Sequence, residues 1–119
     1  MKRDMDLIRD LLLRIESDPR FDGVHWIPFD KSYEFAGHSF EEVTYHVDLL
    51  FEARLIKGND RGDAPMIRGL TWEGHEFLDD IKDSGIWEKT KARVAVLPGV
   101  ALSVIAEIAK AEIKKRLGL

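Results

Sequence analysis

The four histidines are the residues best suited to metal binding or proton transfer, and their spacing favours neither. They stand at His25, His38, His46 and His75. No pair shows the His-Glu-x-x-His spacing that places two metal-binding imidazoles on one helix face. His75 and Asp79 lie four residues apart, which suits general acid–base chemistry. They belong to a run of mostly acidic residues, however, and such a run is typical of a solvated helix face. We therefore predict no metal site, no catalytic residue and no enzyme activity.

Two other common sources of chemistry are missing from the sequence. The chain has no cysteine, which excludes disulfides, thiolate nucleophiles and zinc held by cysteine. It also lacks the Gly-x-x-x-x-Gly-Lys-[Ser/Thr] and Gly-x-Gly-x-x-Gly loops that hold nucleotide phosphates. We accordingly predict that the protein uses no cofactor.

Contact with DNA is a chemistry that the central part of the chain could support. Lys57, Arg61 and Arg68 occur in and beside a turn-rich segment between two short predicted strands. There they could hold phosphates, while Thr44 and Tyr45 on the preceding helix could reach the base edges. These five residues form the predicted DNA-binding set.

Carboxylates on that same helix oppose DNA binding. Glu41, Asp48 and Glu52 fall with Tyr45 on the face opposite its apolar residues. A helix that lies in a DNA groove needs cations or amides, and three carboxylates repel phosphate. We therefore favour protein binding through Glu41, Asp48 and Glu52, and sequence-specific DNA binding is the alternative.

Local signals define the elements that must position these residues. Ser39 followed by Glu42 forms a capping-box pattern at the start of the central helix, and Thr71 is expected to cap a later helix. Residues 83–85 indicate a break. The predicted helices cover residues 5–17, 39–53, 71–81, 86–97 and 101–117, with extended segments at 23–28, 55–56 and 66–70.

The order of these elements predicts the fold class. A helix, a second helix, a two-stranded wing and a closing helix form an α+β, mainly α, winged helix-turn-helix. We assign this domain, with its short β-wing, to residues 1–83 and a C-terminal helical extension to residues 84–119.

The last predicted helix has a broad aliphatic face, which includes Val104, Ile105, Ile108 and Ile113. We favour pairing of this face with its copy in a homodimer. It could instead pack on the first helix of the same chain. The third alternative is a membrane surface, because lysines flank the apolar face.

Three phrases of the sequence resemble a known family. They are Met-Lys-Arg-Asp-Met-Asp-Leu-Ile-Arg at residues 1–9, Tyr-His-Val-Asp-Leu-Leu at 45–50 and Leu-Thr-Trp-Glu-Gly-His-Glu-Phe-Leu at 70–78. They are similar to the domain-of-unknown-function family 2513 of small bacterial and prophage proteins, over roughly residues 1–91. The resemblance implies a winged-helix-like core and a bacterial or phage origin, and it supplies no catalytic residues.

Composition fits one small domain acting through surface contacts. The 119 residues carry a net charge of −4, which argues against indiscriminate binding to nucleic acid. The N-terminus lacks a signal-peptide core, and the longest apolar stretch, residues 94–106, is too short to span a bilayer. We expect a phage- or prophage-associated regulatory or adaptor protein in the bacterial cytoplasm, bound to a protein partner or to its own copy.

Overall fold

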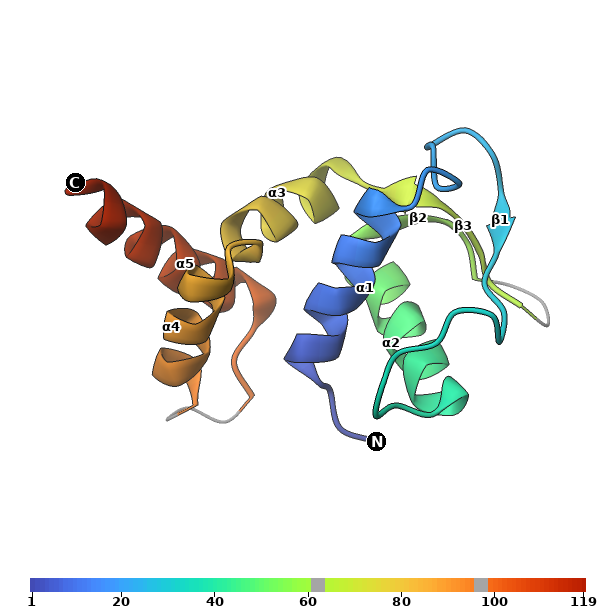
Figure 1. Cartoon of the computed structure of the whole chain (residues 1–119), viewed down its shortest axis with the longest axis horizontal. Coiled ribbons are helices and arrows are strands. Elements are labelled where there is room, and N and C mark those ends of the chain that lie inside the picture. The colour runs from blue at the N-terminus through green and yellow to red at the C-terminus, as the bar shows by residue number, and fades with distance from the viewer. Residues whose placement is uncertain (61–63, 96–98) are drawn as a thin grey trace. The chain divides into compact units, whose positions relative to one another are not determined.

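The chain folds into a mainly helical α+β structure with one small antiparallel sheet (Figure 1). The computed structural model describes residues 1–60, 64–95 and 99–119. Within these residues lie five helices and three strands: α1 (Met5–Ser17), β1 (Ile27–Pro28), α2 (Phe40–Glu52), β2 (Ile56–Asn59), β3 (Met66–Leu70), α3 (Trp72–Ile81), α4 (Ser84–Val94) and α5 (Leu102–Leu117). The predicted α+β, mainly helical class is therefore confirmed.

Contacts within the chain define two compact units, Met1–His75 and Glu76–Leu119. The division falls inside α3, whereas the sequence places a domain boundary after residue 83, beyond the end of that helix. None of the helices in the described ranges has the length and apolar content needed to cross a membrane.

The core of the first unit lies between α1, α2 and the sheet. Each of the two helices presents one apolar stripe to this core. A side-chain hydrogen bond caps the start of each helix and so sets where the helix begins. The Asp4 carboxylate accepts the N–H of Leu7, and the Ser39 hydroxyl accepts the N–H of Glu42, which confirms Ser39 as a cap. The core residues of these elements are Leu7, Ile8, Leu11, Leu12, Ile15, Val43, Val47, Leu50, Ile56, Ile67 and Leu70.

The sheet has the strand order β1-β3-β2, and all its pairs are antiparallel. Strands β2 and β3 form the predicted hairpin, with Ile56 opposite Leu70. The sequence predicted extended backbone over residues 23–28, but only Ile27–Pro28 pairs with the sheet. The reason is the Asp22 carboxylate, which accepts the N–H groups of the two residues after Gly23 and turns the chain.

A three-way joint connects the end of α2, the start of β2 and the start of α3. Thr71 caps α3, as predicted: its hydroxyl accepts the N–H of Gly74 at 2.9 Å and donates to the carbonyl of Arg54 at 2.7 Å. A Cβ atom on Gly74 would lie 2.0 Å from the carbonyl oxygen of Leu55. Arg54 itself has a φ of 60°, a left-handed conformation that favours glycine.

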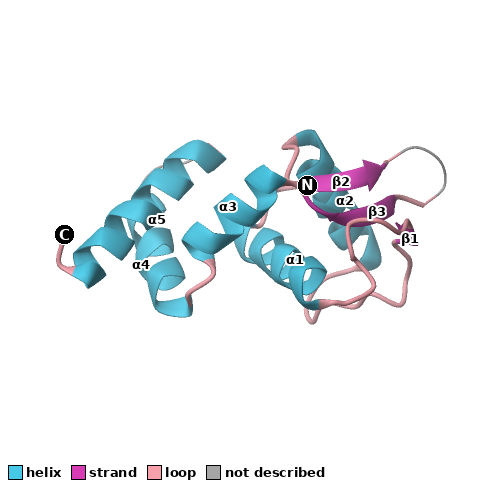
Figure 2. Ribbon diagram, turned by 90° about the horizontal axis from the view of Figure 1, so that it is seen from above, coloured by secondary structure: helices cyan, strands magenta, loops and turns pink. Residues whose placement is uncertain are grey.

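In the second unit, α4 and α5 pack side by side (Figure 2). The Asp83 carboxylate caps α4 by accepting the N–H of Ile86, so the break lies at residue 83 and residues 84–85 already belong to the helix. Trp87 of α4 and Ile105 of α5 are both buried. One face of α5 is thus covered by α4, a partner that the sequence did not indicate.

Candidate functional site

The outward face of α2 and the end of the β2–β3 hairpin enclose a groove of about 450 Å³. We call it the α2 groove. Its lining residues are Glu41, Thr44, Tyr45, Asp48, Phe51, Asp60 and Pro65. Most of them project from α2 at spacings of three or four residues, which places them on successive turns of one face.

The opposite face of α2 keeps this groove turned outward. Val43, Val47 and Leu50 are buried against α1 and the sheet. Between them, His46 is fully buried, with 0% of its surface exposed. Burial of this stripe orients the helix, so that Glu41 and Asp48 reach solvent at the groove.

The α2 groove combines negative charge with aromatic surface. Glu41, Asp48 and Asp60 supply carboxylates, and none of the lining residues in the described ranges is basic. The rings of Tyr45 and Phe51 are only partly exposed. Such a surface can attract a cation and can also bury an apolar group.

The groove lining also includes the Thr44 side chain. Its oxygen is buried and forms no hydrogen bond within the described part of the chain. A buried hydroxyl without a partner is costly. The sequence did not indicate this property, because a helical threonine usually bonds to a carbonyl of the preceding turn.

The residues predicted to bind DNA do not come together at one surface. Thr44 and Tyr45 line the α2 groove among carboxylates. Lys57 instead lines a smaller pocket of about 210 Å³, together with Asp22 and other residues of the first unit. Arg61 lies outside the described residues.

Arg68 has a structural partner that the sequence did not indicate. Its Nη2 atom donates to the carbonyl of Gly23 at 3.0 Å, and the Gly23 N–H donates to the carbonyl of Arg68 at 2.8 Å. The guanidinium also lies over the ring of Trp26, 5.3 Å from its centroid. These contacts fasten the segment before β1 to the sheet.

The residues predicted to bind protein separate into three groups. Glu41 and Asp48 line the α2 groove, whereas Glu52 is exposed at the end of α2 and outside the groove lining. On α5, Ile105 is buried, Ile108 and Ile113 are half-buried, and Val104 is 42% exposed. The aliphatic face of α5 is therefore divided between its contact with α4 and solvent.

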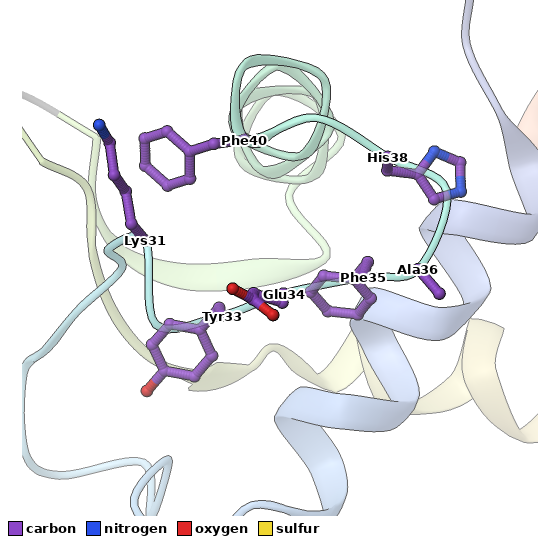
Figure 3. Close-up of a pocket in the computed structure, with 7 residues that line it drawn as sticks. All are labelled: Lys31, Tyr33, Glu34, Phe35, Ala36, His38 and Phe40. Carbon is purple, nitrogen blue, oxygen red and sulfur yellow. The ribbon is translucent and has the colours of Figure 1, made fainter.

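A second cavity, of about 580 Å³, lies inside the loop before α2 (Figure 3). Its walls come from residues 31–40 and include Lys31, His38 and Phe40. Tyr33 contributes its ring, but its hydroxyl points away from the cavity (Figure 3). Burial raises the pKa of this phenol above 10.0, so the hydroxyl stays neutral. The cavity thus offers few polar groups that converge on a ligand.

The histidines are distributed over separate contacts. His25 pairs with Asp22, and His38 pairs with Glu42. His75 lies 3.9 Å from a carboxylate oxygen of Glu16. The described residues contain no group of three or more histidine and acidic side chains arranged to hold a metal ion.

Comparison with known proteins places the chain in a family. A protein of Haemophilus influenzae described as "Uncharacterized protein" is 34% identical over 122 residues, which cover 98% of this chain and 99% of that protein. No solved structure matches the chain significantly. A family model described as "Hypothetical protein (DUF2513)" matches residues 2–101. The chain therefore belongs to the domain-of-unknown-function family 2513.

Proposed function

We propose that this protein is a non-enzymatic winged-helix module that acts as a regulatory adaptor by binding another protein. In this proposal α2 corresponds to the second helix of the motif, and the β2–β3 hairpin corresponds to its wing. The α2 groove is the binding surface.

The composition of the α2 groove carries this proposal. It is a concave surface on an exposed helix face, and it combines partly exposed aromatic rings with carboxylates. Protein interfaces commonly contain aromatic residues at their centre and polar groups at their rim. A groove of this kind suits a short protein segment better than a flat surface does.

Sequence-specific DNA binding is the alternative function, and the helix-plus-hairpin order favours it. The charges oppose it, because Glu41 and Asp48 stand where a DNA-binding helix would meet phosphates. The guanidinium of Arg68 is already bonded to Gly23. One of its five N–H donors is therefore already used within the fold.

Affinity capture with charge-reversed variants tests the proposal. The full-length protein should retain a protein from a lysate of its host, and Glu41→Lys with Asp48→Lys should abolish this capture. Glu52→Lys is the control, because it makes one such charge reversal on α2 outside the groove lining. Capture that survives the double change would contradict binding through the groove.

Fluorescence anisotropy with duplex DNA distinguishes the alternative. We expect no binding to mixed-sequence duplexes at low salt, where any phosphate contact is strongest. Binding that weakens in Arg68→Ala and Lys57→Ala variants, with a reduced salt dependence, would instead support a DNA-binding protein.

A further inference from the structure

We infer that the α2 groove recognises an arginine side chain of its partner, presented beside an apolar residue in a basic peptide segment. This inference rests on the proposed function and adds the chemistry of the bound segment. The charge and the ring surface of the groove each support it.

The charge of the groove selects a cationic segment. Glu41 and Asp48 lie two turns apart on α2, and Asp60 comes from the end of the hairpin. The carboxylates of these three residues form no hydrogen bond or ion pair with other side chains in the described ranges. The first unit as a whole carries ten Lys/Arg against fifteen Asp/Glu, so its long-range field also attracts a cation.

The rings of the groove favour arginine over lysine. Tyr45 and Phe51 can lie against a planar guanidinium, which stacks on aromatic faces and still donates several hydrogen bonds in its plane. An ammonium group is more strongly hydrated and gains less from such a surface. A neighbouring apolar residue of the partner would cover the remaining ring surface.

The same chemistry occurs within this chain. The guanidinium of Arg20 lies 4.8 Å from the ring centroid of Tyr33 while it pairs with the carboxylate of Asp18. Arginine bound between a ring and a carboxylate is therefore an arrangement that this fold already contains. Among its described lining residues, the α2 groove offers both a ring and a carboxylate.

Selection from a displayed library of short random peptides tests the inference on the full-length protein. Selected peptides should contain arginine next to an apolar residue. Replacing that arginine by citrulline, which keeps its shape and removes its charge, should weaken binding by about tenfold or more in fluorescence anisotropy. The charge-neutral variant Glu41→Gln/Asp48→Asn/Asp60→Asn should weaken binding similarly, and replacing arginine by lysine should have a smaller effect.

A second variant separates this inference from the proposed function. Tyr45→Ala/Phe51→Ala removes ring surface and leaves the carboxylates, and far-ultraviolet circular dichroism confirms that each variant is folded. Peptides without cations that bind the charge-neutral variant normally but lose affinity for Tyr45→Ala/Phe51→Ala would overturn arginine recognition and leave the groove as a protein site. If no peptide is selected, or if the selected peptides bind all variants equally, both the arginine inference and the proposed protein-binding function are overturned.

Discussion

The buried ring of His46 accepts the backbone N–H of Asp4 at its Nε2 atom, at a distance of 2.7 Å. Its Nδ1 atom lies 2.8 Å from the carbonyl oxygen of Glu42. An N–H can only donate and a carbonyl can only accept, so these partners define a neutral ring with its proton on Nδ1. His46 thus joins the start of α1 to the middle of α2, and it supports the helix that forms the α2 groove.

Replacement of His46 should destabilise the protein strongly. His46→Ala leaves a cavity and an unpaired backbone N–H at Asp4, so we expect the free energy of unfolding to fall by about 2–4 kcal/mol. Urea denaturation followed by tryptophan fluorescence measures this change. His38→Ala is the control: this half-exposed histidine pairs with Glu42 at the surface and should cost under about 1 kcal/mol. Similar losses in both variants would contradict the role assigned to His46.

Glycine in place of Arg54 should stabilise the protein. At a φ of 60° the Cβ atom of an L-residue is strained, and glycine removes that strain at some cost in chain entropy. We expect Arg54→Gly to raise the free energy of unfolding by roughly 0.5–1 kcal/mol. Arg54→Ala removes the side-chain atoms beyond Cβ and keeps Cβ itself, so it should not raise the free energy of unfolding. An equal gain from alanine would show that the effect comes from the arginine side chain.

A methyl group at Gly74 should disturb the joint between β2 and α3. Its Cβ would lie 2.0 Å from the carbonyl oxygen of Leu55, so α3 would have to move. We expect Gly74→Ala to lower the free energy of unfolding by about 2 kcal/mol or more, although alanine is the better helix former. Gly69→Ala is the matched control, because its nearest neighbour would lie at 3.5 Å, an ordinary contact. An unchanged melting temperature in Gly74→Ala would refute this close approach.

The Asp83 cap should make the second unit sensitive to acid. The N–H of Ile86 and the guanidinium of Arg116 hold the pKa of Asp83 below its ordinary value of 3.8. The unfolded chain therefore binds this proton more readily, and the stability that the charge supplies is present above that value and lost as pH falls through the lowered pKa.

Melting temperatures of the wild type and Asp83→Asn, compared across acidic pH, measure this contribution. The difference between them should be largest near neutral pH and should shrink as pH falls below about 4. It should be smaller throughout when Arg116→Ala is also present. A difference that grows in acid would have the wrong sign for a lowered pKa.

The proposed homodimer through α5 gives a prediction about oligomeric state. Val104 is 42% exposed on α5 beside the half-buried Ile108, so it remains available to a second copy. Val104→Glu should convert a dimer to a monomer in sedimentation velocity at several concentrations. Ser103→Glu adds the same charge at an exposed neighbouring position and should leave the dimer intact. A monomeric wild-type protein would exclude this dimer.

Helix starts could be predicted because their signals are local. Ser39 and Thr71 were expected as caps from residue type and position alone, and each hydroxyl accepts an N–H three residues later. The predicted helix over residues 5–17 likewise agrees with α1.

Helical spacing predicted the exposed face of α2, but the contacts that hold this helix and the sheet in place could not be predicted, because they join distant residues. His46 meets Asp4 across 42 positions, and Arg68 meets Gly23 across 45. Neither contact produces a periodic pattern in the sequence of the kind that predicts helices and strands. The buried Glu112 of α5 also depends on a distant residue, Arg93 of α4. Burial alone would raise the pKa of Glu112, yet the hydrogen bond from Arg93 and the charge of Lys115 lower it.

The division of the chain inside α3 limits how the gene could recombine. A crossover between His75 and Glu76 would join the first turn of α3 from one gene to its later turns from another. Those later turns contain the buried residues Phe77, Leu78 and Ile81. An exchange that keeps α3 whole would require a crossover before Thr71 or near Asp83. We therefore expect the two compact units to be inherited together more often than two domains joined by a loop.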